Sequence, residues 1–303
     1  MITRQVSMSQ EWRAVTVLAL CTGALAAGQA PPARLNQPEK ETSMSTLNFR
    51  MAAALLALGA LALSAIVPTE VRAQAPAVDP AATKILQRMT DYLGSLQQFS
   101  VHTQNTLEDV LDSGQRVDFD VSASVIISRP NKLRAERVGD LISQEFYYDG
   151  KTLTLYNPSD KVYATEPAPG TIEGVLDFAR ESLGLTVPVA DLVYRNAFPL
   201  LMQDVTFAVV VGKAVIGGVK CDHVLFSRPG VDFQVWVADD GQPLPRKYVV
   251  TDTGTPARLS ITTVIGDWNV APAVADARFA FVPPQGAKPI TFMRLDTTSG
   301  SSR

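Results

Sequence analysis

Few side chains of this sequence combine a reactive type with a spacing that could support chemistry. The only two histidines, His102 and His223, lie in separate stretches that read as strands. A lone histidine in a strand is more often packed or solvent-facing than catalytic, because catalysis needs reactive partners beside it. The acidic pair at 239–240 precedes a glycine and indicates a turn. Asp118 and Asp120 are spaced to share the solvated face of one strand.

Sequence signatures of common enzyme classes are also missing. The sequence has no Gly-x-Ser-x-Gly, His-Glu-x-x-His or Cys-x-x-Cys pattern and no glycine-rich phosphate loop. Cys221 is the single cysteine after residue 73, and we expect it to be a small buried hydrophobe. Trp236 and Trp268 lie on predicted strands and mark either an aromatic rim or core. We therefore expect no enzymatic activity, no metal site and no cofactor.

Residues 44–73 show the three parts of a secretory signal peptide. A short polar start carries Arg50, an uncharged apolar run follows at 51–67, and Val71-Arg72-Ala73 offers a small-residue cleavage site. The alternative is an uncleaved membrane anchor, although the apolar run is slightly short for a spanning helix. We expect cleavage, so that the working protein begins near Gln74 and is periplasmic.

Residues 1–43 precede this signal peptide and contain a second apolar run. A signal peptide does not normally follow another one, so we interpret 1–43 as a gene-model extension or leader. A sharper alternative makes Leu18-Ala19-Leu20-Cys21 a lipoprotein cleavage box, but Leu20 is large where that box needs a small residue.

The remaining residues, 74–303, have the length and composition of a single folded domain. About 230 residues can bury one good core. After residue 73, 21 Lys and Arg stand against 26 Asp and Glu, a net charge of about −5 with no basic cluster. This pattern argues against binding to nucleic acid. No apolar stretch after Gln74 is long enough to span a bilayer.

Hydrophobic periodicity predicts one helix followed by strands. Asp79 can cap a helix that Pro80 opens, and apolar residues at helical spacing predict an amphipathic helix over 80–97. From Phe99 onward the period changes to two, and turn residues separate the segments. The clearest predicted strands cover 117–127, 145–148, 152–156, 162–165, 207–216, 220–226, 231–237, 246–251 and 258–268.

Helical spacing returns between Thr171 and Met202. The first of two predicted helices ends at Gly184, and Pro188 can open a second that continues through Phe198. About eleven strands with tight turns predict one antiparallel meander. Its apolar face needs a cover, so we expect a strongly curved sheet with helices over its concave side. The interior is then either solid core or a cavity for an apolar ligand.

Three short motifs and the order of elements resemble the LolA/LolB-like lipoprotein-carrier superfamily, which includes RseB-like sensors. The motifs are Arg129-Pro-Asn-Lys-Leu-Arg-Ala-Glu136, Tyr148-Asp-Gly-Lys-Thr-Leu-Thr-Leu-Tyr-Asn-Pro158 and Phe279-Ala-Phe-Val-Pro-Pro-Gln-Gly-Ala287. More narrowly, the chain is similar to an uncharacterised family of predicted periplasmic proteins, over about residues 79–290. The resemblance implies a mainly β fold, an open antiparallel half-barrel of about eleven strands with a helical lid. Relatives hold lipid or lipoprotein acyl chains inside.

Two hypotheses for function follow. In the first, the protein takes up an acyl chain, lipid or lipoprotein in an apolar cavity between sheet and lid. In the second, it is an envelope sensor or interaction protein of RseB type that binds a membrane protein partner. For the first hypothesis, the predicted cavity-lining residues are Phe119, Val121, Val125, Phe207, Val209, Phe233 and Val235.

Overall fold

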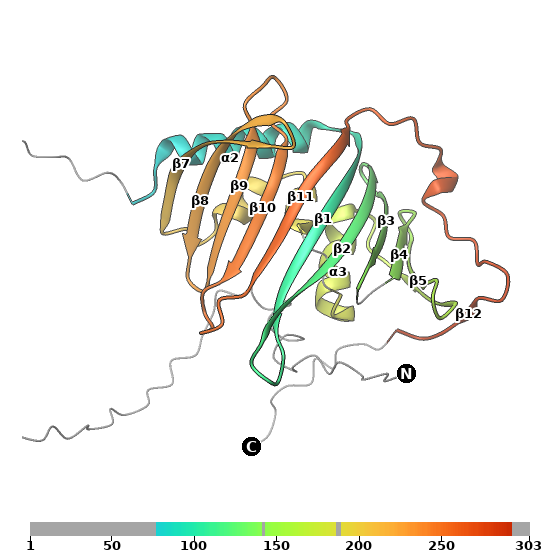
Figure 1. The fold of residues 1–303 in the computed structure, drawn as a ribbon. Coiled ribbons are helices and arrows are strands. Elements are labelled where there is room, and N and C mark those ends of the chain that lie inside the picture. The colour runs from blue at the N-terminus through green and yellow to red at the C-terminus, as the bar shows by residue number, and fades with distance from the viewer. Residues whose placement is uncertain (1–76, 141–142, 186–188, 293–303) are drawn as a thin grey trace, which may run out of the picture. The chain divides into compact units, whose positions relative to one another are not determined.

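The computed structural model of the protein describes residues 77–140, 143–185 and 189–292 (Figure 1). The predicted signal peptide at 44–73 and the segment at 1–43 lie outside the described residues. The described helices are α2 (Pro80–Ser95), α3 (Ile172–Leu183) and α4 (Ala197–Met202), with short 3-10 helices η1 (Ala190–Val193) and η2 (Asp276–Arg278).

One twelve-stranded sheet contains every described strand. The strands are β1 (Gln98–Val110), β2 (Arg116–Ser128), β3 (Lys132–Gly139), β4 (Ser143–Tyr148), β5 (Thr152–Asn157), β6 (Val162–Pro167), β7 (Phe207–Ile216), β8 (Val219–Arg228), β9 (Val231–Ala238), β10 (Pro245–Asp252), β11 (Ser260–Asn269) and β12 (Lys288–Pro289). Their spatial order is β12-β6-β5-β4-β3-β2-β1-β11-β10-β9-β8-β7, with β1 and β11 joining the two halves. The short β12 pairs parallel with β6, whereas the other pairs are antiparallel. This linear order leaves the sheet open, which confirms the predicted half-barrel with helices.

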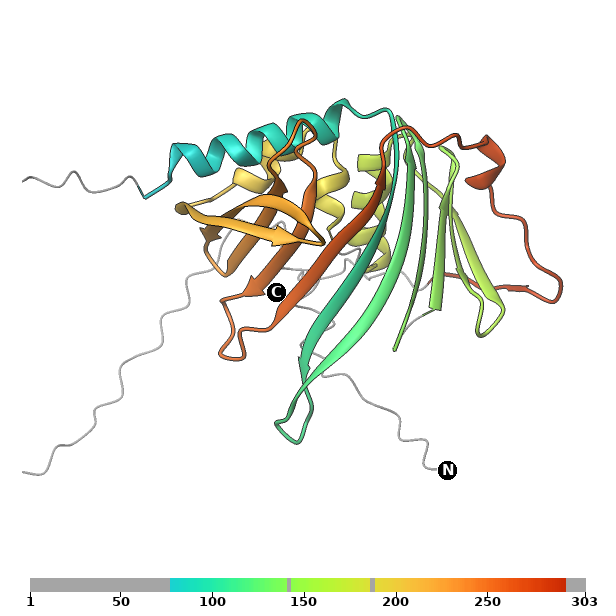
Figure 2. The same cartoon turned by 45° about the horizontal axis from the view of Figure 1, so that its top comes forward.

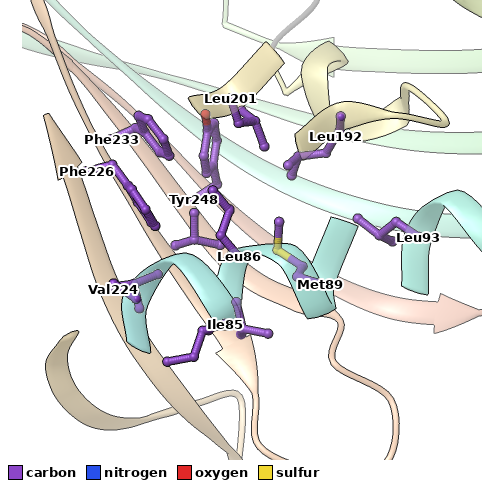
Figure 3. Close-up of a cluster of buried hydrophobic side chains, with 14 of the residues drawn as sticks. Ile85, Leu86, Met89, Leu93, Leu192, Leu201, Val224, Phe226, Phe233 and Tyr248 are labelled. Carbon is purple, nitrogen blue, oxygen red and sulfur yellow. The ribbon is translucent and has the colours of Figure 1, made fainter. Parts of the chain in front are cut away.

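Helix α2 covers the part of the sheet made by β7, β8 and β9 (Figures 1 and 2). The Asp79 side chain accepts a hydrogen bond from the Ala81 N–H at 2.8 Å, and Pro80 opens the helix as predicted. The apolar stripe of α2 packs into a first core cluster with strand and α4 side chains (Figure 3). Its buried α2 members are Ala82, Ile85, Leu86, Met89 and Leu93.

Helix α3 covers the other half of the same sheet face. The Thr171 hydroxyl accepts a hydrogen bond from the Gly174 N–H, and Gly184 ends the helix in a left-handed conformation with φ 62°. A second core cluster joins α3 to β1–β5 through Phe99, Ile127, Leu133, Phe146, Tyr148, Leu153, Ile172, Val175, Leu176, Ala179 and Leu183. We call the face under α2 and α3 the inner face and the opposite face the outer face.

The second predicted helix after Gly184 is not continuous. Pro188 lies outside the described residues, and the segment beyond it forms η1 and α4 rather than one helix through Phe198. Between η1 and α4, the chain forms hydrogen bonds with α3. The Tyr194 hydroxyl donates to Asp177 at 2.6 Å, and the Arg195 N–H donates to Glu173 at 3.0 Å.

The outer face carries two smaller apolar groups. Near β4–β6, the ring of Phe281 lies 5.0–5.5 Å from those of Tyr147, Tyr156 and Tyr163. Through this contact the segment around 279–281 packs back on the sheet. On β8, Cys221 is 0% exposed and packs with Trp236 and Val249, which confirms its prediction as a small buried hydrophobe.

Candidate functional site

The strand register brings five of the seven predicted lining residues onto the inner face. Phe119, Val121 and Val125 project there from β2, and Phe233 and Val235 project there from β9. The two groups lie well apart in the sheet, because β1, β11 and β10 separate β2 from β9.

Phe207 and Val209 of β7 lie on the outer face instead, and the predicted facing of these two residues was wrong. Ala208, which alternates with them, is 1% exposed in the first core cluster, while Phe207 is 42% exposed. Ala208 pairs with Phe226 of β8, and Phe226 lies in the same cluster. The run Phe207-Ala-Val-Val-Val211 is apolar at every position. Alternation therefore gave no information about which residues point inward.

A continuous row of apolar side chains crosses the inner face through five neighbouring strands. We call it the apolar row, and its members pair directly in the order Phe233, Val250, Ile261, Leu107 and Phe119. Phe233 is 1% exposed within the first core cluster, and Val250 packs against that cluster. The other three are half-buried and belong to neither core cluster. The row thus begins in the first core cluster and ends with three side chains outside both core clusters.

A second row, beside the apolar row, is polar at its centre. It runs Val235, Tyr248, Thr263, Asn105 and Val121, and we call it the polar row. Asn105 and Thr263 are 5% and 1% exposed. The Thr263 hydroxyl donates to Asn105 Oδ1 at 2.8 Å, and Asn105 Nδ2 donates to the Val121 carbonyl at 3.0 Å. These bonds satisfy the polar groups between β11, β1 and β2 and fix the register of the strands that carry the apolar row.

Three ionisable side chains gather at the Phe233 end of these rows. Arg228 of β8 lies on the inner face with its guanidinium 6.0 Å from the Phe233 ring centroid. Tyr248 is 3% exposed, and its ring centroid is 6.1 Å from that of Phe233. Figure 3 shows the Tyr248 hydroxyl pointing away from α2 toward Leu201 of α4. Asp191 of η1 is 4% exposed beside Leu192, a member of the same core cluster.

Among the described residues, none of these three side chains has a hydrogen bond or an ion pair, although their charges act on one another. Burial raises the pKa of Asp191, the positive charges of Arg228 and Arg180 oppose that shift, and Asp177 adds to it. Burial and the charge of Asp191 also raise the pKa of Tyr248. A buried carboxyl without a partner favours its neutral form.

Arg129, which directly follows β2, holds η1 in place. Its side chain is 1% exposed. Its Nε donates to the Leu96 carbonyl at 3.1 Å, and its Nη2 donates to the Val193 carbonyl at 2.6 Å. A carboxylate oxygen of Glu173 lies 3.5 Å from Nη1. One side chain therefore joins the end of α2, α3 and the turn that carries Asp191.

Both histidines lie on the outer face, away from the two rows. His102 pairs with Ser124, on the face opposite Val101 and Val125. The His223 ring stacks on Trp236 with centroids 3.9 Å apart, and its Nε2 lies 2.9 Å from Gln234 Oε1. Burial and the charge of Lys247 lower the pKa of His223, while the bond to Gln234 opposes them. In the described part of the chain, no group of three or more His, Cys, Asp or Glu side chains could hold a metal ion.

Sequence reasoning missed Leu107, Ile261 and the three ionisable residues. Leu107 and Ile261 each occur in a strand segment rich in polar residues, so apolar content did not single them out. Asp191 and Tyr248 belong to no sequence motif. The position of Asp191 on η1, and that of Tyr248 on β10 between β9 and β11, follow only from the fold.

A family of predicted periplasmic proteins (DUF2092) matches residues 82–293. The chain belongs to this family. The match confirms both the predicted family and the predicted periplasmic location. It covers nearly all of α2, every described strand and α3. No helix in the described ranges is long and apolar enough to cross a membrane.

Several solved structures are similar to part of this DUF2092 protein over nearly their own whole length. An uncharacterised conserved protein from Thermus thermophilus is 11% identical, with 70% of this chain and 99% of that chain covered and a TM-score of 0.42. LprF from Mycobacterium bovis is 14% identical, with 70% and 100% covered and a TM-score of 0.41. A LolA superfamily protein from Nitrosomonas europaea is 11% identical, with 66% and 97% covered and a TM-score of 0.34. A comparison with curated protein sequences gave no match.

Proposed function

We propose that this protein binds the acyl chain of a lipid or lipoprotein in the periplasm, with the chain lying along the apolar row. The observation that carries the proposal is the position of Ile261, Leu107 and Phe119. They project side by side from three central strands and belong to neither core cluster. Apolar side chains that a fold leaves out of its core are suited to receive an apolar ligand.

The dimensions of the apolar row fit a long acyl chain. From Phe233 to Phe119 the row crosses five strands. Four interstrand spacings make a length of about 19 Å. Each methylene group that moves from water into such a site contributes about 0.8 kcal/mol. A chain along the part of the row outside both core clusters, from Ile261 to Phe119, can therefore gain binding free energy without any polar contact.

The proposed lining set differs from the sequence prediction in a defined way. Phe119 and Val121 remain in it, and Val125 borders it beside the second core cluster. Phe233 and Val235, at 1% and 0% exposure, close its buried end as core residues. Phe207 and Val209 leave the set because they lie on the outer face.

Native mass spectrometry of protein purified from an envelope extract, with uptake of a fluorescent fatty acid, tests this function. We expect a co-purified amphiphile and saturable uptake. The variant Phe119→Ser should weaken uptake, whereas Val264→Ser on the outer face, where Val264 is 41% exposed, should not. Consistently empty protein without uptake, or equal loss in both variants, would contradict the proposal.

A second candidate function is binding of an envelope protein partner at the edge strand β7. Beyond a bridge between Val78 and Ala208, β7 pairs only with β8 in the described part of the chain. Its side chains Phe207, Val211 and Val215 are 42%, 53% and 64% exposed. An open edge with β-branched side chains can receive a strand from another protein. Recovery of no protein partner in pull-downs from envelope extracts would remove this candidate.

A further inference from the structure

Arg228, Tyr248 and Asp191, at the buried end of the apolar row, offer donors and a positive charge that favour one kind of ligand head group. Arg228 offers a permanent positive charge, and Tyr248 offers a hydroxyl donor. The Asp191 carboxyl, 4% exposed, is a donor in its neutral form. The Asp191 and Tyr248 side chains are 4% and 3% exposed, whereas Arg228 is half-buried. Burying the first two without hydrogen bonds is unfavourable, so their arrangement points to a ligand that supplies acceptors.

We infer that Arg228, Tyr248 and Asp191 bind the carboxylate of a long-chain fatty acid whose chain lies along the apolar row. The inference rests on the proposed function and names the ligand class for the same site. A carboxylate pairs with the Arg228 guanidinium and accepts hydrogen bonds from the Tyr248 hydroxyl and the protonated Asp191 carboxyl. An amine head group fits less well, because Arg228 would repel it.

The positions of the three side chains support this assignment, in addition to their chemistry. The Arg228 guanidinium and the Tyr248 ring lie 6.0 and 6.1 Å from the centroid of the Phe233 ring, which is the most buried member of the row. Asp191 sits on η1, whose residue Leu192 belongs to the first core cluster while Ala190 and Val193 pack against the second. The head group would therefore sit where the two halves of the core meet, and the chain would extend toward the open Phe119 end.

Binding should depend on pH through Asp191. The charged and titratable groups that act on it are Arg228 of β8, Tyr248 of β10, and Arg180 and Asp177 of α3. An ionised Asp191 would repel the ligand carboxylate, so Asp191 must be protonated in the complex. Because burial raises the pKa of Asp191, this requirement is met in acidic buffer and lost as the pH rises.

Isothermal titration of the full mature chain with palmitic acid and with hexadecanol tests the inference. We expect the acid to bind about ten- to a hundredfold more tightly than the alcohol, the usual worth of a hydrogen bond to a charged group. Arg228→Gln should remove that preference. Arg278→Gln, which removes the same charge from an exposed position on η2, should keep it.

The pH dependence gives a second readout. The affinity of the wild-type protein for palmitic acid should fall as the pH rises, and Asp191→Asn should flatten that dependence because its amide donates at every pH. Equal affinity for acid and alcohol, or an unchanged preference in Arg228→Gln, would overturn the head-group inference alone. Absence of binding by both probes would overturn the proposed function and this inference together.

Discussion

Replacing Arg129 with methionine should destabilise the fold more than any exposed arginine substitution. Arg129→Met keeps most of the side-chain volume but removes the hydrogen bonds to the Leu96 and Val193 carbonyls and the ion pair with Glu173. Hydrogen bonds from a charged donor contribute about 1.5–3 kcal/mol each. The Glu173 carboxylate that remains is 32% exposed and keeps its hydrogen bond from the Arg195 N–H, so loss of the ion pair should add less than about 1 kcal/mol.

The two lost hydrogen bonds should therefore lower the free energy of unfolding by about 3–6 kcal/mol. Urea denaturation followed by tryptophan fluorescence measures this change, because Trp268 packs against both core clusters and Trp236 packs with Cys221 on the outer face. The matched control is Arg116→Met, since the Arg116 side chain is 52% exposed and pairs with Glu108 on the surface. That pair should contribute less than about 1 kcal/mol. A loss below about 1 kcal/mol for Arg129→Met would refute the view that this side chain holds α2, α3 and η1 together.

Three further predictions follow from burial and charge. Phe233→Ala should lower the free energy of unfolding by about 3–5 kcal/mol. Phe119→Ala should lower it clearly less, because Phe119 is half-buried outside both core clusters. Equal losses in urea denaturation would contradict the division of the row into a core end and an open end. Burial in the folded state raises the pKa of Asp191, so the contribution of Asp191 to stability is complete below the ordinary aspartate pKa and is lost as the pH rises through the pKa in the folded state. Asp191→Asn should therefore show a flatter decline of melting temperature toward alkaline pH. Parallel curves for the variant and the wild type would contradict this role. Cys221 should react slowly with iodoacetamide in the native protein and quickly in urea, because it is 0% exposed and burial raises the pKa of its thiol; rapid native labelling would count against that packing.

Much of the fold was predictable because local chemistry agreed with the final structure. Asp79 and Pro80 begin α2, Gly184 ends α3, and strict alternation over Val117–Ile127 gave the correct inner face of β2. Each of these signals depends on near neighbours in the chain. The break between η1 and α4 was not predictable, because it depends on contacts of Tyr194 and Arg195 with α3.

The candidate site was predictable only in part, for the same physical reason. Phe119 and Phe233 were both assigned to the lining, yet nothing in the sequence indicated that they are two ends of one row. That relation requires the pairing of β1 with β11, which lie more than 150 residues apart in the chain (Thr106 pairs with Thr262). Phe207 and Val209 were assigned to the wrong face because an apolar run does not alternate with polar residues. The burial of Asp191 could not be predicted, because it depends on where η1 lies in the fold.

The most direct test of acyl-chain binding along the apolar row is photo-crosslinking with a fatty acid that carries a diazirine in its chain, mapped by peptide mass spectrometry. The account predicts labels on the inner-face peptides that contain Leu107, Phe119 and Ile261, with competition by unlabelled palmitic acid. Labels confined to the outer face at Phe207 or Val264, or no label that palmitic acid competes away, would contradict it.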